Sequence, residues 1–552
     1  MEARPCPIID FFNGTKQMVV PLFQRSYEWG PREWQAQWED LLEQYERTEQ
    51  ETVASHFTGA IVTAPAKSVP IGVSKFLVID GQQRLTTIAL FLCALRSFFE
   101  KTTPKYRKLT SLLVNEYDEG ADYYKLLPTQ LDRSAFKSII DNEEGKPSRF
   151  MDAFEYYQSK ISGADSDGQK IDLDRMADTI QSRLTVVAIH LGDADDPYLI
   201  FESLNAKGAP LTQADLIRNY LLLRLHAGEQ QKAYELSWLP MQSLLVGDNL
   251  TEFMRQYLML PGDEVGKSSI YAVLKSRLAK VHDGLIADEL LKMQKLSIVY
   301  AQIIGLIPFP QVQIDRGLGR LRRWEVATAN VILLKLLRMH RDGEIVDADI
   351  IDCIRTLESF VVRRAICGVP TNQLKRIFLA VAKELPEEDV PAWLTENLAA
   401  GTAGRRWPKN EELHNSLLRY RAYSQPLDRC KFLLEALEQD HKHKELASFV
   451  TASIEHIMPQ TLTDEWREML GPDADDVHER HIDLLGNLTL TGYNSELSNF
   501  PFSKKKELFD ESHFELNKWV TAQDKWTDIE IGAQSNMLFE RVKIIWSRPA
   551  ME

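Results

Sequence analysis

A stretch of about two hundred residues without strand signals sets the main limit on the fold. From about residue 230 to 440 the sequence is rich in Leu, Ala, Glu and Lys, and it predicts one helix after another. Before and after this stretch, short apolar runs bounded by Gly, Asp or Asn indicate strands mixed with helices. A chain of 552 residues also exceeds what one hydrophobic core usually supports. We therefore predict a predominantly helical α+β protein with domains at 1–230, 231–440 and 441–552.

The composition narrows the class of protein. An apolar fraction of 44% and a charged fraction of 26% are ordinary values for a globular protein. The sequence has no run of eighteen apolar residues and no basic-then-apolar N-terminus, so we expect a cytoplasmic protein without a membrane partner. Its five cysteines are scattered and lack C-x-x-C spacing, which argues against a disulfide framework and against a zinc site.

The net charge of −15 is unusual for a protein that contacts DNA, because phosphate contacts need Lys and Arg. Local clusters, however, set the field in a cleft. Three are present, at 316–323 (RGLGRLRR), 405–409 (RRWPK) and 504–506 (KKK). For each of them a solvated face is the simpler interpretation, but the third gains weight from its position behind the motif described next.

The segment 455–460 (EHIMPQ), followed by Asn487 and Asn494, has the residue types that cutting a phosphodiester requires. The reaction needs a base that deprotonates water and a cation that neutralises charge on the phosphate. A neutral His takes a proton readily near pH 7, so His456 fits the base. Mg²⁺ or Mn²⁺ prefers oxygen ligands, which Glu455 and Asn494 could supply. Neighbouring residues of a strand point to opposite faces, so Glu455 and His456 could share one site only at a kink or a strand end.

Asn487 has two open interpretations. It could bond the His456 ring or a neighbouring backbone group and so fix the orientation and tautomer of the imidazole. Alternatively, Asn487 after Gly486 and Asn494 after Tyr493 are ordinary turn residues. In combination with the E-H-x-x-P pattern, the two Asn residues favour the catalytic interpretation.

The segment 80–84 (DGQQR) lies between an expected strand at 76–79 and an expected amphipathic helix at 82–99. Free backbone N–H groups at a helix start favour an anion, Gly81 allows close approach, and Arg84 can bind phosphate with two hydrogen bonds. The pattern therefore indicates binding of a nucleotide or of a DNA phosphate. A structural turn, with Asp80 as a helix cap or a cation ligand, remains the alternative.

Two further blocks combine polar and aromatic residues. In 21–29 (PLFQRSYEW), the side chains of Gln24, Arg25 and Tyr27 could bracket a base or a phosphate, although aromatic residues also fill cores. The block 201–211 contains Asn205. Strands are also expected at 57–62 and 184–189, and a helix is expected at 213–225, where Thr212 and Asp215 have capping-box spacing.

These motifs resemble one family. EHIMPQ followed by LLGNLTLTGYNSELSNFPFSKKK is similar to the C-terminal His-Me finger (HNH-type, ββα-metal) nuclease domain of GmrSD-type, modification-dependent restriction enzymes. VPLFQRSYEW, FLVIDGQQRLTT and FESLNAKGAPLT resemble the ParB/sulfiredoxin-like N-terminal domain of the same family, in the order of its fused single-chain members.

The resemblance implies roles for individual residues. It places the general base at His456, a supporting catalytic residue at Asn487, and the metal at Glu455 and Asn494, where the longer Glu455 could act through water. DNA contacts are implied for Asn499, Lys504, Lys505 and Lys506. The nucleotide site would comprise Gln24, Arg25, Tyr27, Asp80, Gly81, Gln82, Gln83, Arg84 and Asn205.

The implied function is a type IV restriction-like DNA endonuclease or nickase that acts on modified or phage double-stranded DNA in anti-phage defence. Its cofactors would be Mg²⁺ or Mn²⁺ and a nucleoside triphosphate (GTP, ATP or CTP), which the N-terminal domain would bind and hydrolyse to control cutting. Two alternatives remain. One is a nucleotide-switched DNA-binding protein with a degenerate nuclease domain, and the other is a helical scaffold for other defence proteins. Homo-oligomerisation is left open.

Overall fold

The computed structural model describes residues 2–22, 24–47, 56–66, 72–130, 132–143, 145–192, 212–225, 227–324, 326–441, 449, 451–492 and 499–549. Its contacts divide the chain into two compact units. The first consists of Met1–Pro240 with Tyr271–Leu291, and the second of Met241–Ile270 with Lys292–Glu552. The predicted boundaries at 230/231 and 440/441 remain predictions. Within the described residues, no helix combines the length and the apolar character that crossing a membrane requires.

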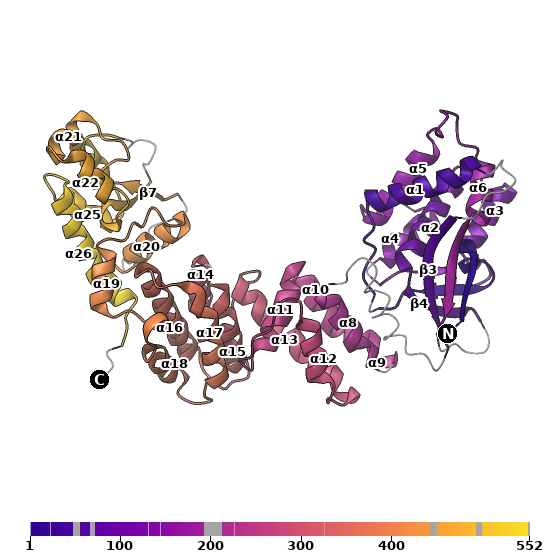
Figure 1. The fold of residues 1–552 in the computed structure, drawn as a ribbon, viewed down its shortest axis with the longest axis horizontal. Coiled ribbons are helices and arrows are strands. Elements are labelled where there is room, and N and C mark those ends of the chain that lie inside the picture. Colours follow the sequence, from indigo (N-terminus) through magenta and orange to yellow (C-terminus); the bar gives the residue numbers. More distant parts are fainter. Residues whose placement is uncertain are drawn as a thin grey trace. The chain divides into compact units, whose positions relative to one another are not determined.

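The first unit is built on a six-stranded mixed sheet (Figure 1). Its strands lie in the order β1 (Glu2–Pro7), β6 (Leu184–His190), β3 (His56–Pro65), β4 (Ser74–Asp80), β2 (Lys16–Val19) and β5 (Leu126–Leu127). β1 with β6 and β3 with β4 are antiparallel, whereas the other neighbours are parallel. Because β2 and β4 are parallel, their carboxyl ends meet at one edge of the sheet. The segment after β2 and the D-G-Q-Q-R segment after β4 therefore lie at the same edge.

The predicted strands at 57–62, 76–79 and 184–189 are confirmed as β3, β4 and β6. The sequence did not reveal β1, β2 or β5. β1 has the sequence EARPCP, and its two prolines fit because it is an edge strand that needs no complete ladder of hydrogen bonds. β2 and β5 are four and two residues long, too short for a clear alternating pattern.

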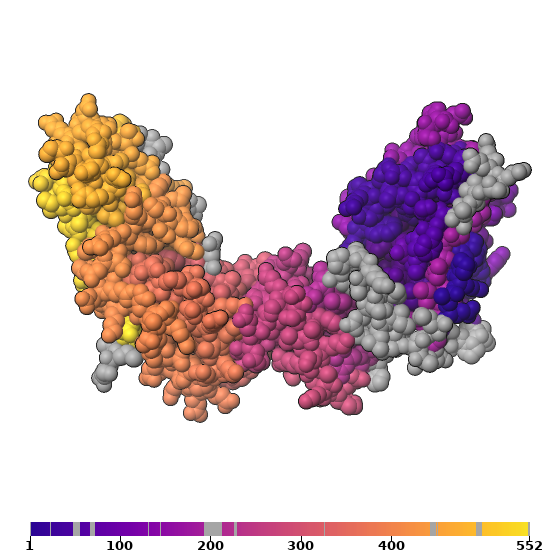
Figure 2. Space-filling view, viewed as in Figure 1, coloured from indigo at the N-terminus to yellow at the C-terminus, as the bar shows by residue number. Residues whose placement is uncertain are grey.

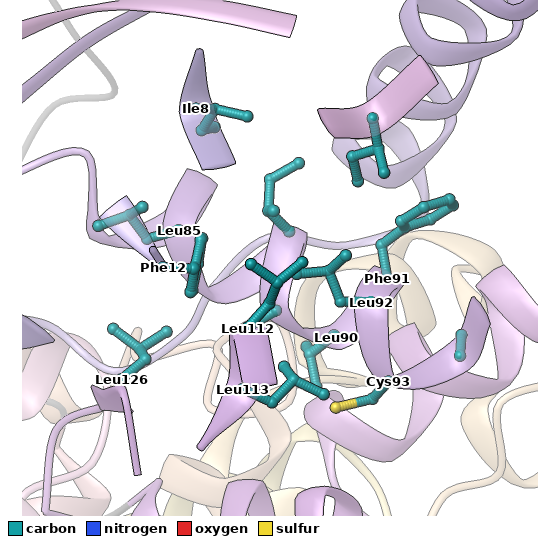
Figure 3. Packing of buried hydrophobic residues seen from close by; sticks show 14 of the residues in the cluster. Ile8, Phe12, Leu85, Leu90, Phe91, Leu92, Cys93, Leu112, Leu113 and Leu126 are labelled. Carbon is teal, nitrogen blue, oxygen red and sulfur yellow. The ribbon is translucent and has the colours of Figure 1, made fainter. Parts of the chain in front are cut away.

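Helix α2 (Gln82–Arg96) is the centre of the first core (Figure 3). Every one of its residues except Arg84 is buried, so the predicted one-sided amphipathic helix is wrong in this respect. One face of the sheet covers α2, and helices pack around its remaining sides. These and the other helices of this part are α1 (Pro31–Glu46), α3 (Pro104–Leu113), α4 (Arg133–Asp141), α5 (Arg149–Ile161) and α6 (Leu173–Ser182), with the short 3₁₀ helix η1 (Ile8–Phe11).

Short helices complete the first unit. They are α8 (Gln213–Leu223), α9 (Ala227–Ala233), the π-helical turn η3 (Tyr234–Trp238), α12 (Ile270–Leu278) and the 3₁₀ turn η4 (Asp283–Leu285). The predicted capping box is confirmed: the Thr212 hydroxyl accepts from the Asp215 N–H at 3.1 Å, and the Asp215 carboxylate accepts from the Thr212 N–H at 3.3 Å. Helix α8 therefore begins where the sequence indicates.

The second unit confirms the predicted helical stretch, because every described regular element between α10 and α20 is a helix. The helices are α10 (Leu239–Leu244), α11 (Asp248–Met259), α13 (Ile286–Ile304), α14 (Val312–Arg323), α15 (Asn330–Arg341), α16 (Asp347–Ile366), α17 (Leu374–Glu384), α18 (Val390–Ala399), α19 (Asn410–Leu417) and α20 (Leu427–Gln439), with 3₁₀ turns between some of them. Helices α10, α12 and α13 each include residues of both units.

The remaining elements of the second unit are β7 (Ser453–His456), α21 (Asp464–Leu470), α22 (Ala474–His481), η8 (Leu485–Asn487), β8 (Leu488–Thr491), α24 (Phe502–Asp510), α25 (Glu515–Thr521) and α26 (Asp528–Ile545). β7 and β8 form an antiparallel pair in which His456 faces Leu488. α26 contacts α19 and α20. Residues from α20 onward, orange to yellow in Figure 2, accordingly form one continuous mass with the helices before them.

Most Arg side chains of the basic cluster at 316–323 bond to other groups inside the second unit. Arg320 forms two hydrogen bonds with Glu358, at 2.8 and 2.5 Å, and Glu358 is buried. Arg323 pairs with Asp428 at 3.0 Å and also with Glu435. These guanidinium groups hold helices together, so they do not form a surface for nucleic acid.

Candidate functional site around His456

Strands β7 and β8 and helix α24 build the surroundings of His456. His456 is the last residue of β7, and the chain turns immediately after it. A compact core anchors this turn, because Ile457 and Met458 are buried against Trp466, Phe502 and Trp526. Helices α21 and α22 lie between β7 and β8 in the sequence, and α24 follows β8.

The His456 side chain is buried, with only 8% of its surface exposed. Its Nε2 atom is inaccessible and has no hydrogen-bond partner among the described residues. The nearest acidic oxygen is Asp483 Oδ1, at 3.9 Å. The Tyr423 ring meets the imidazole edge-on, with the ring centroids 4.3 Å apart. Burial lowers the pKa of His456 to about 4, although Asp483 opposes the shift. The imidazole is therefore neutral near pH 7, as a general base must be.

Asp483 was not identified from the sequence. It follows α22 and is held by the segment between α19 and α20: its Oδ2 accepts from the Ser424 hydroxyl at 2.7 Å and from Arg421 at 3.1 Å. Its backbone carbonyl also accepts from the Tyr423 N–H at 3.2 Å. No sequence motif joins these residues to His456. The hydrophobic spacing of α22 predicts a helix, but it does not show where Asp483, which follows the helix, lies in the folded chain.

Glu455 and Lys505 form a buried ion pair next to His456. The Lys505 ammonium donates to the Glu455 carboxylate at 2.6 Å and to the His456 carbonyl at 2.7 Å. The Lys505 side chain is 0% exposed, and the Glu455 side chain is 6% exposed. Because strand residues alternate, Glu455 points away from the His456 side chain, toward α24. In this structure Glu455 is the counter-ion of Lys505, and both side chains are buried. The metal-binding role of Glu455 and the DNA contact of Lys505 remain predictions.

Of the contacts expected for Asn487, the structure shows bonds to neighbouring backbone groups. Its catalytic role remains a prediction. Its carbonyl oxygen accepts from the Met458 N–H at 2.8 Å and from the Trp526 indole N–H at 3.0 Å. Its amide nitrogen donates to the carbonyls of Met458 and Ile482, both at 3.0 Å. The side chain is completely buried and has no remaining capacity for the His456 ring. It secures the turn that follows His456.

The expected DNA-contacting residues separate into different environments. Lys504 is exposed and pairs with Glu507 at 2.6 Å, and Asn499 is exposed as well. Lys506 is half-buried and donates to the Gln523 carbonyl at 2.5 Å. It lines a cavity of about 710 Å³ whose other charged residues are all acidic: Glu465, Glu507, Asp510 and Asp524. Of the expected DNA-contacting residues, Lys504 and Asn499 are exposed, and the DNA contacts remain predictions. The expected metal ligand Asn494 lies outside the described residues.

In the first unit, three glutamines tie the segment after β2 to the D-G-Q-Q-R segment. Gln24 donates to the Ile79 carbonyl at 2.8 Å, and Gln82 donates to the Arg25 carbonyl at 3.1 Å. Gln83 donates to the Ser26 carbonyl at 3.1 Å and accepts from the Glu28 N–H at 2.9 Å. The structure thus brings two of the sequence blocks together, and the amide side chains form the connection.

Tyr27 is part of the core of the first unit. Its hydroxyl lies 2.8 Å from the Thr87 hydroxyl and accepts from the Trp34 indole N–H at 2.8 Å. Tyr27, like the three glutamines, is more than nine-tenths buried. In this structure these four side chains hold the protein itself, which leaves direct ligand contact to other members of the predicted site.

Arg25, Asp80, Gly81 and Arg84 are those other members. Gly81 begins α2 with φ of 91°, and a Cβ there would lie 2.9 Å from the Ile61 side chain. Arg84 bonds the Ala60 carbonyl and lies against Gly59. Arg25 pairs with Glu28 at 2.8 Å, and Asp80 is half-buried at the end of β4. Asn205 lies outside the described residues.

Comparisons with known proteins match one segment within each of the two compact units. Residues 8–222 match the family model described as GmrSD restriction endonuclease, N-terminal domain. Residues 407–541 match the model described as GmrSD restriction endonucleases, C-terminal domain. A search among curated proteins found no match. The two family matches together cover more than half of the 552 residues and include both domains, so the chain belongs to the GmrSD restriction endonuclease family.

Proposed function

We propose that the protein is a type IV restriction-like endonuclease that hydrolyses phosphodiester bonds in modified or phage DNA. The observation that carries this proposal is the environment of His456, a buried neutral imidazole at the end of a strand within the matched C-terminal domain. A base for water attack must be unprotonated at the working pH and held in one orientation. Burial provides the first property, and the turn secured by Asn487 contributes to the second.

In this mechanism His456 takes the proton from the attacking water. Tyr423 limits the rotation of the imidazole by contacting its ring, and Lys505 fixes the backbone carbonyl of His456. Lys504 supplies an exposed positive charge for the DNA backbone. The expected cleavage product and the nicking or double-strand character of the cut depend on how DNA lies against these groups.

Dependence on Mg²⁺ or Mn²⁺ is a separate part of the proposal. The described residues contain no group of three or more His, Cys, Asp or Glu side chains that could hold a metal ion. Glu455, the expected carboxylate ligand, is bonded to Lys505. Asn494, the other expected ligand, lies outside the described residues. A cation would neutralise charge on the scissile phosphate. Support for its use comes only from the family resemblance.

We also propose that the first unit binds a nucleoside triphosphate at the edge of the sheet where Arg25, Asp80 and Arg84 lie, and that hydrolysis there regulates cutting. The start of α2 supports this proposal, because the N–H groups at the start of a helix attract phosphate. Arg84 is the one residue of α2 that is not buried. Binding of GTP, ATP and CTP to the wild type and to Arg84→Ala, measured by calorimetry, tests it. Equal binding by both proteins would contradict it.

A cleavage assay tests the nuclease proposal. Plasmid DNA and DNA from phages with and without modified bases are incubated with the full chain, Mg²⁺ or Mn²⁺, and GTP, ATP, CTP or no nucleotide. We expect cleavage by the wild type in at least one condition and none by His456→Ala. Intact DNA in every condition, or equal cleavage by both proteins, would overturn the proposal. EDTA added to an active condition tests the dependence on metal.

One observation favours the second candidate, a nucleotide-switched DNA-binding protein with a degenerate nuclease domain. The pairing of Glu455 with Lys505 removes the acid next to the His from the site. This candidate predicts that DNA is retained in a gel-shift assay in a nucleotide-dependent way and is never cut. Cleavage that disappears in His456→Ala would exclude it.

A further inference from the structure

One ring nitrogen of His456, Nε2, is buried without a hydrogen-bond partner among the described residues. Nε2 is inaccessible to solvent, so a water molecule cannot reach it for attack on DNA. A buried polar atom without a partner is rare, and a catalytic role is one of the explanations for it. Among the charged groups around His456, Lys505 and His478 disfavour a proton on the ring and Asp483 favours one. Asp483 Oδ1 is also the acidic oxygen that Nε2 faces.

Asp483 is held so that one oxygen remains for His456. Oδ2 is occupied by the Ser424 hydroxyl and by Arg421, and the Asp483 carbonyl is bonded to the Tyr423 N–H. Oδ1 lies 3.9 Å from Nε2, about 1 Å longer than an ordinary hydrogen bond. Hydrogen bonds of catalytic groups are often long in the free enzyme and shorten in the complex. A small rotation of either side chain would close this gap.

We propose that Asp483 is the positioning residue for His456: its Oδ1 accepts a hydrogen bond from Nε2–H, so that Nδ1 is the nitrogen that takes the proton from water. The proposal rests on the proposed nuclease function. A carboxylate that orients a catalytic imidazole fixes both the tautomer and the ring angle. It differs from the sequence interpretation, in which Asn487 could have this role, because every hydrogen-bonding atom of Asn487 is already used.

The substitution Asp483→Asn probes this role with little change in shape. The amide oxygen can keep the bonds from Ser424 and Arg421, and the amide nitrogen then faces Nε2 as a donor. A donor at this position favours the opposite tautomer, with the proton on Nδ1 and no lone pair there for water. We expect kcat for DNA cleavage to fall on the order of 10²-fold to 10⁴-fold, with KM and the unfolding midpoint unchanged. Asp483→Glu, which keeps the carboxylate, should recover part of kcat.

Asp476→Asn is the matched control, because Asp476 lies on the adjacent helix α22 and is exposed. It should keep the kcat of the wild type. Cleavage by Asp483→Asn at the wild-type kcat would overturn the proposal. A loss of activity that merely follows unfolding would also lower the unfolding midpoint, and Asp483→Glu then provides the comparison within a folded protein.

Nuclear magnetic resonance of the full chain labelled with ¹⁵N-histidine tests the proposal without any substitution at Asp483. The two ring nitrogens of His456 are assigned by comparison with His456→Gln, and their shifts show which one carries the proton. We expect the proton on Nε2 in the wild type. A proton on Nδ1 would overturn the positioning role even if the enzyme cuts DNA. A protein that shows Nε2–H but never cuts DNA would instead contradict the proposed function alone.

Discussion

The Lys505 ammonium lies 2.6 Å from the Glu455 carboxylate, and together these two residues form a buried ion pair between α24 and β7. Removing one partner leaves the other charge buried without compensation. We expect Glu455→Gln or Lys505→Met to lower the free energy of unfolding by about 3–5 kcal/mol. Denaturation followed by tryptophan fluorescence measures the change, because Trp466 and Trp526 lie in the same core.

The double variant Glu455→Leu/Lys505→Met should lose less than either single variant, since no unpaired charge remains. Lys504→Met is the matched control on the same helix. Its partner Glu507 is exposed, so we expect a change below about 1 kcal/mol. Equal losses for Lys504→Met and Lys505→Met would contradict the buried pair.

Asn487→Ala should reduce stability and cleavage together. The substitution leaves the polar backbone groups of Met458, the Ile482 carbonyl and the Trp526 indole N–H without their partner. Buried groups that lose a partner cost about 1–3 kcal/mol each, and partial relaxation makes the sum smaller. Thermal unfolding and cleavage rates measured on the same preparation test this. His456→Gln should abolish cleavage with a much smaller change in unfolding midpoint, and the opposite ranking would be inconsistent with the role we assign to Asn487.

The pH dependence of stability reports the burial of His456. Its pKa is lowered from 6.5 to about 4, so the unfolded chain binds more protons than the folded chain between these values. The stabilisation from the neutral imidazole is therefore fully present above pH 6.5 and is lost as the pH falls toward 4. Its largest value is about 3 kcal/mol. Urea denaturation of the metal-free protein at several pH values measures it. A His456→Gln variant with the same pH dependence as the wild type would contradict this account.

Gly81→Ala should destabilise the first unit for two separable reasons. Gly81 has φ of 91°, where an L-residue is strained, and the added Cβ would lie 2.9 Å from the Ile61 side chain. We expect a loss of about 2–4 kcal/mol. Gly14→Ala is the matched control, because Gly14 has φ of 76° but open space around the added Cβ, and it should lose about 1 kcal/mol. Equal losses in urea denaturation would show that the contact with Ile61 is unimportant.

Thiol reactivity tests the packing of both units. Burial raises the pKa of Cys93, Cys353 and Cys430 to about 12 each, so the reactive thiolate is scarce at pH 8 and is also shielded. We expect Ellman's reagent to modify these three thiols only after unfolding. Cys6 and Cys367 are half-buried and should react earlier. Rapid modification of all five cysteines in the native protein would contradict the described cores.

Local patterns predicted the elements that frame both sites. The strands β3, β4 and β6, the start of α8 and the helical stretch before β7 follow from hydrophobic spacing and from capping residues, which act within a few positions of one another. Family motifs also drew attention to His456 and to the D-G-Q-Q-R segment. The short strands β1, β2 and β5 escaped detection, because two to six residues carry too little periodicity.

The sequence by itself therefore predicted the class of the fold, its long helical stretch and the position of the candidate base. Only the tertiary structure decided which group each polar side chain near His456 contacts. Glu455 is next to His456 in the chain, but strand alternation turns it toward Lys505, fifty positions away. Asp483 and Tyr423 are distant in sequence, and the packing of loops brings them to the imidazole. A pattern of residues records chemical type and spacing, whereas the partner of a buried polar group depends on which segments the folded chain brings within hydrogen-bonding distance.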